Sequence, residues 1–148
     1  MNQVAVNDTE SRIPNPVFKF VEYKLYHYRE NKAAIKAWEE MREDILQRGR
    51  QWQIGFPPPE GQHSPTEEKT IQMMILEQKA QRELFWIRAI EDVLAILPEQ
   101  DKRLVELKYF EGYLTNAGVA RELNMSERAF YDRREVIIRR FAIRFGLL

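Results

Sequence analysis

The sequence contains no cysteine among its 148 residues. This excludes disulfide frameworks, thiolate zinc sites and cysteine nucleophiles. Its two histidines, His27 and His63, lack the spacing of metal ligands, so surface or core positions are expected for both. The chain also has no glycine-rich phosphate loop and no Gly-x-Ser-x-Gly turn. We therefore expect a protein that is not an enzyme and uses no cofactor or metal.

Long hydrophobic runs are also missing. No stretch of 18 apolar residues occurs, so no transmembrane helix is expected. The first residues, MNQVAVNDTESR, have neither the basic flank nor the apolar core of a signal peptide. These features predict a cytoplasmic protein that does not bind a membrane.

Net charge is zero, but the charge is unevenly distributed. Residues 112–148 hold seven arginines against four acidic residues, whereas residues 1–111 hold 16 basic against 19 acidic residues. A basic stripe on a neutral protein favours a specific anionic partner. A solvated helix face, with pairs such as Glu135 and Arg139, explains the charge alone equally well.

The N-terminal half reads as two long helices. Pro14 and Pro16 suit a first helical turn, and apolar residues then recur at helical spacing. They form one stripe: Val17, Val21, Leu25, Tyr28, Ile35, Trp38 and Ile45. This predicts a helix to about Arg48, with Gly49 as its C-cap. Residues 1–13 are polar and unpatterned and are expected to be a disordered arm.

The linker after this helix contains three consecutive prolines, Pro57 to Pro59, which exclude a helix interior. Ser64 and Pro65 then start a second helix that runs to Leu97, and its polar middle, residues 78–83, suggests a break. We therefore predict a helical hairpin over residues 14–83, with a Pro-rich loop at 50–63, followed by a separate domain at 84–148. The hairpin is expected to serve oligomerisation or partner contact.

Shorter helices follow Pro98, and the spacing of their caps predicts a helix-turn-helix. Thr115 can cap a helix that contains Ala120 and Leu123, and Asn124 tolerates the left-handed conformation that a sharp turn requires. Ser126 can cap the final helix, which reaches about Phe145 before Gly146. Phe130 then falls one turn into this helix, where it can plug the first. No segment alternates as a strand does, so the fold class predicted is all-α.

If Ala120, Leu123 and Phe130 face the core, polar side chains remain on the exposed side of the final helix. These are Glu127, Arg128, Tyr131, Asp132 and Arg134. An arginine can bridge guanine O6 and N7, and a glutamate can accept from cytosine N4. A mixture of donors and acceptors favours base readout in the major groove of double-stranded DNA over purely electrostatic binding.

Residues from about 90 to 140 resemble region 4 of bacterial sigma factors, the domain that binds the promoter −35 element. The resemblance is carried by AIEDVLAILPEQDKRLVELKYFEGY and TNAGVARELNMSERAFY, in the usual order and spacing. The whole chain is also similar to phage late transcriptional regulators of the ArpU and RinA type. These resemblances imply a long helical hairpin followed by a sigma region 4-like helix-turn-helix domain, in a protein of the bacterial host cytoplasm.

The resemblance aligns Glu127, Arg128, Tyr131 and Asp132 with the recognition-helix positions that touch DNA. The full set of candidate DNA-binding residues is Thr115, Ser126, Glu127, Arg128, Tyr131, Asp132, Arg133 and Arg134. Two positions depart from the sigma pattern. Glu127 stands where a cation is common, so the −35 hexamer is not carried over as the target. Arg133 replaces a buried aliphatic, which predicts either a shifted helix or an arginine that extends out to phosphate.

The implied function is sequence-specific regulation of phage or prophage late genes, with bacterial RNA polymerase as a further partner and a homodimer as the expected assembly. A complete sigma factor is not expected, because the N-terminal half lacks the segments that read the −10 element. One alternative is a phage small terminase subunit, which also joins a helix-turn-helix to a helical oligomerisation region. Another is a module that binds polymerase and not DNA.

Overall fold

A computed structural model describes residues 12–53 and 66–148, with side chains over 12–48 and 70–148. These residues are all-α and contain no strand. Expectations for His63, the three prolines, the Ser64 cap and most of the arm lie outside them. The helices are α2 (Asn15–Tyr26), α3 (Tyr28–Gln53), α4 (Thr66–Ile96), α5 (Glu99–Val105), the π-helical turn η1 (Glu106–Glu111), α6 (Asn116–Glu122) and α7 (Glu127–Arg144). None of these helices is long and apolar enough to cross a membrane.

Two compact units divide the described residues. We call residues 29–87 the hairpin unit, and the chain up to Tyr28 together with Arg88–Leu148 the C-terminal unit. The C-terminal unit is thus built from two segments that lie on either side of the hairpin in sequence. The sequence expectation assigned residues 14–28 to the hairpin, whereas the structure packs them with the helix-turn-helix. Val21 and Leu25 explain this difference, since both are completely buried in the C-terminal unit.

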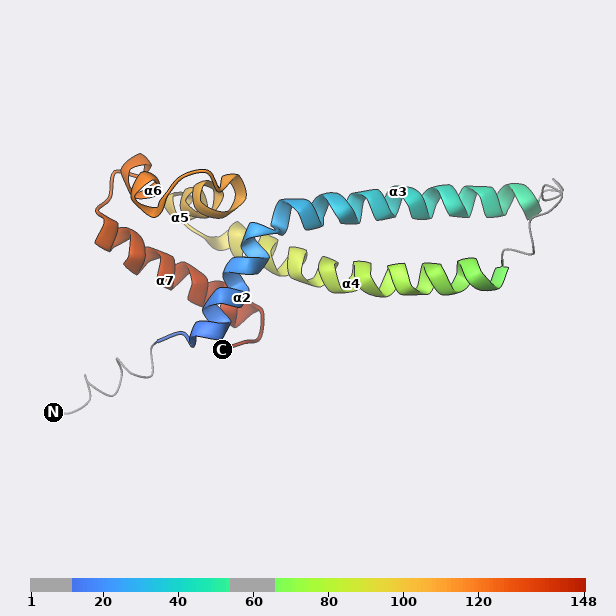
Figure 1. Ribbon diagram of the computed structural model, residues 1–148, viewed down its shortest axis with the longest axis horizontal. Helices are drawn as coiled ribbons and strands as arrows, with labels where there is room; N and C mark the ends of the chain where they lie inside the picture. Colours follow the sequence, from blue (N-terminus) through green and yellow to red (C-terminus); the bar gives the residue numbers. More distant parts are fainter. Residues whose placement is uncertain (1–11, 54–65) are drawn as a thin grey trace. The chain divides into compact units, whose positions relative to one another are not determined.

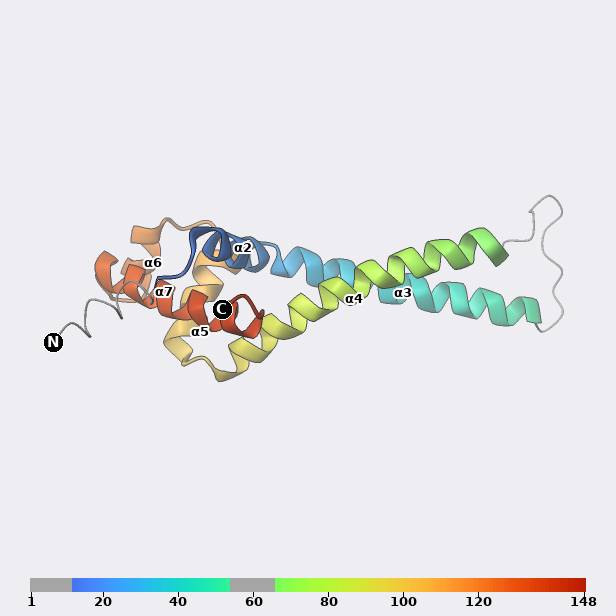
Figure 2. The same ribbon diagram turned by 90° about the horizontal axis from the view of Figure 1, so that it is seen from below.

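Helices α3 and α4 run side by side in opposite directions in the hairpin unit (Figures 1 and 2). Ile35 from α3 and Ala80 and Ile87 from α4 are buried. Farther along, Trp38 and Ile45 lie beside Met73 and Leu76. An ion pair of 3.9 Å joins Arg42 to Glu77. The predicted hairpin is therefore present, with its own apolar seam.

The helix ends differ from the sequence expectation in two places. Helix α3 continues through Gly49 to Gln53, so the C-cap expected at Gly49 is wrong and the loop begins later than residue 50. Helix α4 continues through residues 78–83, where a break was expected. An isolated glycine costs a helix only about 1 kcal/mol, and Gln, Lys, Ala, Arg and Glu are good helix formers. The polar residues at 78–83 therefore indicate an exposed part of α4 and not the end of the helix.

A further difference is the interruption at His27, where the sequence predicted one continuous helix. His27 leaves helical geometry with φ −94° and ψ 3°, and α3 begins at the next residue. The apolar stripe is preserved across the interruption, since Val21, Leu25, Tyr28 and Ile35 are all buried. The interruption divides one stripe between two cores.

The core of the C-terminal unit joins α2, α5, η1, α6 and α7 to the end of α4. Helix α2 packs on α7 and η1, and α6 packs on α7. The largest side chains that are almost completely buried are Tyr109, Phe130, Phe141, Leu25, Ile90, Leu104, Ile137 and Ile138. Glycines end two of the elements in left-handed geometry, Gly112 at φ 70° and Gly146 at φ 77°. The stop at Gly146 matches the sequence expectation.

Candidate nucleic-acid interface

Helix α6 begins at a side-chain cap, as its sequence predicts. Thr115 is extended, with φ −71° and ψ 167°, and its hydroxyl accepts a hydrogen bond from the Gly118 N–H at 3.0 Å. A Cβ at Gly118 would stand 3.3 Å from that hydroxyl and 3.5 Å from the Leu114 side chain. The missing side chain therefore lets the cap and Leu114 close tightly over the first turn.

The turn between α6 and α7 has the hydrogen bonds of a Schellman motif. Asn124 takes the left-handed conformation at φ 54°, and its N–H donates to the Arg121 carbonyl at 3.2 Å. The next N–H, from Met125, donates to the Ala120 carbonyl at 2.9 Å. In addition, the Gln100 side-chain amide donates to the Leu123 carbonyl at 3.3 Å. The carbonyls of Ala120, Arg121 and Leu123 at the end of α6 thus all accept hydrogen bonds, which fixes the angle at which α7 departs.

Helix α7 begins at Ser126, whose hydroxyl accepts from the Ala129 N–H at 3.1 Å. Phe130 follows one turn later and is completely buried, together with Ala120 at 2% and Leu123 at 7% exposure. These three residues form the contact between α6 and α7 that the sequence predicted. The helix-turn-helix is therefore rigid at its turn, which is the requirement for presenting one face of α7 to a ligand.

The N-terminal half of α7 exposes the predicted mixture of charges. Glu127, Arg128 and Asp132 are exposed, and Tyr131 is 42% exposed. The Tyr131 ring meets Phe130 edge to face, with centroids 5.5 Å apart, so its orientation is set by the plug beneath it. These four residues bring two acceptors, one cation and one aromatic hydroxyl to a single surface near the helix N-terminus.

Arg133 is held within the protein, in an arrangement that the sequence analysis did not foresee. Its Nε donates to Asp101 Oδ1 at 2.7 Å, and its Nη2 donates to Asp101 Oδ2. The Asp101 side chain is only 3% exposed, whereas that of Arg133 is 40% exposed. The hydrogen bonds to Asp101 raise the pKa of Arg133. The arginine can stand where the sigma pattern has a buried aliphatic residue, because Asp101 on α5 supplies a buried carboxylate that pairs with it.

Arg134 is also less exposed than predicted. Its guanidinium carbon lies 5.0 Å from the ring centre of Phe18, 5.1 Å from that of Tyr131 and 6.0 Å from that of Phe130. Its Nε is buried and has no hydrogen-bond partner. A guanidinium is weakly hydrated and stacks well on aromatic faces. Arg134 therefore connects α2 to the exposed Tyr131 and is a positioning residue in this geometry.

Helix α2 contacts the same region through a second pair. The Tyr109 hydroxyl donates to Glu22 at 2.7 Å, and the Tyr26 ring meets the Tyr109 ring edge to face at 4.9 Å. Burial, followed by the charge of Glu22 and the hydrogen bond to it, raises the pKa of Tyr109 far above its usual range. Since Tyr109 is itself 2% exposed, this contact anchors α2 on η1.

The later arginines of α7 differ from one another. Arg144 pairs with Asp92 at 2.9 Å, while Arg140 is exposed. Arg139 is partly buried. The basic stripe read from sequence is therefore partly used inside the unit, at Arg133 and Arg144. Arg128 is left as the exposed cation near the start of the helix.

Sequence reasoning located the caps, the turn and the exposed residues, but it missed three contributors, Asp101, Glu22 and Phe18. Asp101 left a detectable signal, since an arginine at a normally aliphatic position requires a buried acid nearby. Phe18 and Glu22 left none, because their partners are more than 80 residues away in sequence. Within the described residues, no group of histidine or acidic side chains could hold a metal ion.

A rigid turn, two capped helices and a polar exposed face define a helix-turn-helix DNA-binding domain. The sequence model of the ECF sigma factor family matches residues 65–144, which is more than half of the chain. The protein therefore belongs to the ECF sigma factor family, and its C-terminal part is a region 4-like domain with a role in transcription. No curated protein and no solved structure matches the chain.

Proposed function

We propose that this protein is a sequence-specific regulator of transcription that reads double-stranded DNA with the N-terminal half of α7. The observation that carries the proposal is the exposed face of Glu127, Arg128, Tyr131 and Asp132 on a helix fixed by Ser126, Asn124 and Phe130. In helix-turn-helix proteins the N-terminal residues of the second helix reach base edges in the major groove.

The candidate DNA-binding residues have different roles in this proposal. Arg128 and Tyr131 make base or phosphate contacts, while Glu127 and Asp132 accept from base amino groups and reject bases that offer only acceptors. Thr115 and Ser126 lie at the two helix N-termini, where backbone N–H groups and hydroxyls suit phosphate oxygens. Arg133 and Arg134 act through their neighbours, since the structure engages one with Asp101 and the other with aromatic rings.

We further propose that the regulated genes are phage or prophage late genes and that the protein activates them with bacterial RNA polymerase. This step rests on the resemblance of the whole chain to regulators of the ArpU and RinA type. A single helix-turn-helix reads too few base pairs to find one site in a genome, so a second anchor is needed. The hairpin unit is the part of the chain available for that role.

Footprinting on the DNA that flanks the gene for this protein tests the proposal. The purified chain alone is expected to protect a short, discrete segment upstream of a late promoter, and added RNA polymerase should extend the protected region. Protection that requires polymerase would support the polymerase-binding module in place of the DNA reader. A ring of about eight or more subunits on DNA near a packaging site would support the small terminase alternative.

A further inference from the structure

The side of α4 that faces away from α3 is apolar. Half-exposed side chains recur along it at helical spacing, with Ile71 58%, Met74 57%, Ile75 50% and Phe85 48% exposed. Gln78 and Arg82 complete this side, and we call the six residues the outer stripe. Three of them, Gln78, Arg82 and Phe85, also line part of a shallow hollow on the surface.

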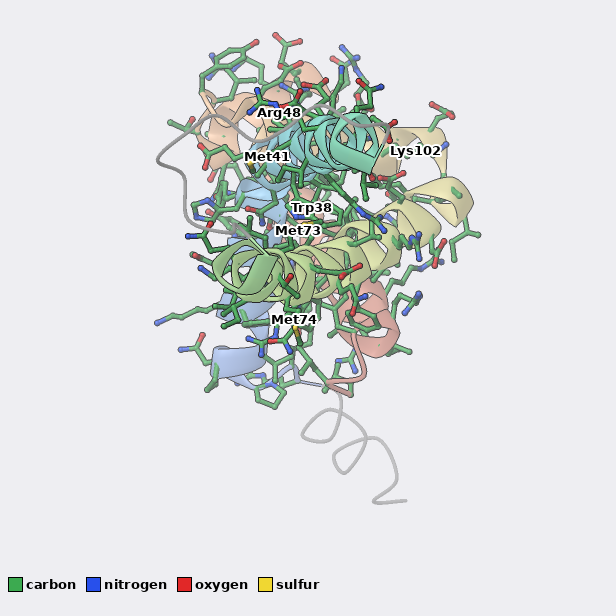
Figure 3. All side chains as sticks on the ribbon, turned by 90° about the vertical axis from the view of Figure 1, so that its right-hand side faces the viewer. Trp38, Met41, Arg48, Met73, Met74 and Lys102 are labelled. Carbon is green, nitrogen blue, oxygen red and sulfur yellow. The ribbon has the colours of Figure 1, made fainter. Side chains whose placement is uncertain are left out.

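The outer stripe is distinct from the seam of the hairpin. Figure 3 shows Met73 next to Trp38, between α3 and α4, while Met74 lies on the opposite side of α4. Helix α4 therefore has two apolar sides, and α3 covers only one of them. The exposed side of α3 is by contrast mostly charged, with Lys36, Glu39, Glu40, Glu43 and Asp44 among its residues. A helix with apolar residues on both sides is normally buried between two neighbours.

The composition of the outer stripe favours a partner of the same kind. It contains one cation, Arg82, and no acidic residue, so it offers nothing to select a highly charged partner. Four half-exposed apolar side chains present on the order of 400 Å². With the stems of the polar residues between them, a face of this kind approaches the roughly 800 Å² per partner of a stable interface.

The spacing of the outer stripe is self-complementary. Ile71 and Phe85 lie seven residues before and after Gln78, which is two helical turns on each side. If two copies of α4 cross antiparallel at Gln78, Ile71 of each copy contacts Phe85 of the other, which gives two such contacts in the dimer. Ile75 then lies beside the aliphatic stem of Arg82 from the second copy, whose guanidinium remains in solvent. The two Gln78 amides meet at the dyad, where they can hydrogen-bond to each other.

We propose that the outer stripe is a homodimer interface, in which two hairpin units pair through antiparallel α4 helices to form a layer of four helices with the two α4 helices at its centre. Each α4 then has two helical neighbours, its own α3 and the α4 of the second copy. The dimer gives the proposed DNA reader its second helix-turn-helix, and this purpose rests on the proposed function. The interface itself rests on the exposure and spacing of the stripe.

The first experiment measures mass in the absence of DNA. Sedimentation equilibrium of the full chain is expected to give twice its 17.7 kDa mass at micromolar concentration. Ile71→Glu, which places a carboxylate against Phe85 of the second copy, should raise the dimer dissociation constant at least a hundredfold, with unchanged helical circular dichroism. Leu46→Glu is the matched control, because Leu46 is a similarly exposed apolar residue, 42%, on the other helix of the same unit. It should leave the dimer intact.

The second experiment tests the register of the two α4 helices by disulfide formation. Because the chain contains no cysteine, an introduced cysteine is its only thiol. Gln78→Cys is expected to form a disulfide with its own copy under mild oxidation, because the two thiols meet at the dyad. Ile71→Cys should not, because its copies lie about 21 Å apart along the antiparallel axis. A mixture of Ile71→Cys with Phe85→Cys should give the mixed disulfide.

Three outcomes would overturn the proposal. One is a full chain that stays monomeric at 100 μM, a concentration well above those used for DNA binding. A second is a monomer in which Ile71→Glu instead weakens binding to purified bacterial RNA polymerase, which would assign the stripe to polymerase. The third is self-crosslinking of Ile71→Cys as fast as Gln78→Cys, which indicates parallel helices. None of these measurements contains DNA, so a failed footprint and a failed dimer remain separate results.

Discussion

At the residue scale, the proposed base readout depends on which arginines of α7 are exposed and which are engaged within the protein. Arg133 and Arg144 are engaged by Asp101 and Asp92, and Arg134 is stacked on aromatic rings. Arg128 is exposed at the second position of α7, two residues after its cap. A count of the charges in this segment therefore does not show which arginines can contact DNA. We expect the specificity of DNA binding to depend most on Arg128.

Arg128→Ala is expected to cost about 1–3 kcal/mol of binding free energy on the correct site and much less on random duplex. The reason is that a base contact is lost along with a charge. Arg140→Ala is the matched control on the same helix, because Arg140 is exposed three turns later. If Arg140 meets phosphate, its loss should weaken both duplexes alike and lower the salt slope by about 1. Titrations at several salt concentrations measure both quantities. Equal weakening of both duplexes by Arg128→Ala would contradict base readout by α7.

The Arg133–Asp101 pair yields a prediction about stability. Arg133→Leu restores the aliphatic residue of the resembling sigma domains but leaves the Asp101 carboxylate buried without its partner. Breaking a buried pair costs about 3–5 kcal/mol, and the partial exposure of Arg133 places the expected loss nearer 2–3 kcal/mol. Arg133→Leu combined with Asp101→Leu should recover most of that loss, since matched apolar pairs replace buried ion pairs well. Urea unfolding of the single and double variants measures it, and additive losses would contradict the pairing.

At the scale of elements, local chemistry was predictable and distant contact was not. The caps at Thr115 and Ser126 and the left-handed Asn124 depend on residues within five positions of one another, so the sequence carries the whole signal. The break at His27, by contrast, separates Val21 and Leu25, which are buried in the C-terminal unit, from α3, which belongs to the hairpin unit. Likewise, Arg134 is stacked because α2 brings Phe18 to it from the far end of the chain. The pattern of residues in a single sequence does not indicate contacts between segments so far apart in the chain.

The anchor between α2 and η1 should produce an alkaline transition. The folded pKa of Tyr109 is raised, mainly by burial, above the value of about 10 in an unfolded chain. A raised folded pKa means that the stabilisation is complete below pH 10 and is lost as pH rises through the folded pKa. Above pH 10 the unfolded chain gains a phenolate that the folded chain cannot form. The free energy of unfolding should therefore fall by about 1.4 kcal/mol per pH unit from this group.

Tyr109→Phe is expected to remove that dependence, since no proton is then left to release at this position. The variant should be less stable at neutral pH, because the hydrogen bond to Glu22 is lost, and its stability should fall less steeply between pH 10 and 11. Tyr113→Phe is the control, because it removes a phenol that is 74% exposed in the folded chain. Urea unfolding at each pH decides the matter. The same slope for Tyr109→Phe and the parent chain would show that Tyr109 ionises freely when folded.

At the scale of the whole molecule, the protein is a helix-turn-helix unit with a hairpin inserted into it. Within the described residues, those from 12 to Tyr28 and those from Arg88 onward form one core, while residues 29–53 and 66–87 form their own. The sequence placed the domain boundary at residues 83 and 84, after the polar stretch 78–83, and it assigned α2 to the hairpin because the stripe of α2 continues into α3 without a change of period. Only packing shows that the stripe serves two cores. The region 4-like domain of this chain therefore includes an N-terminal helix that lies outside the family match at residues 65–144.

This organisation predicts that the hairpin can be removed but α2 cannot. In a shortened chain, a ten-residue Gly/Ser linker, which spans about 17 Å on average, replaces residues 30–86. It should fold cooperatively, because every segment of the C-terminal core is still present. By contrast, the fragment 88–148 should not fold stably. It lacks Val21 and Leu25, and the loss of a single buried aliphatic side chain already costs about 2–5 kcal/mol in a domain of marginal stability.

The same two proteins test what the hairpin does for DNA binding. The shortened chain retains the α7 surface, so it should still bind random duplex, but with the weaker affinity and lower salt slope of a single helix-turn-helix. On the natural site it should bind at least tenfold more weakly, because one helix-turn-helix then replaces two anchored ones. Calorimetric melting and titrations against both duplexes measure these outcomes together. A fragment 88–148 that melts as cooperatively as the shortened chain would remove α2 from the domain. A shortened chain that binds the natural site like the full chain would show that α7 alone supplies the specificity and that the hairpin is not a second anchor.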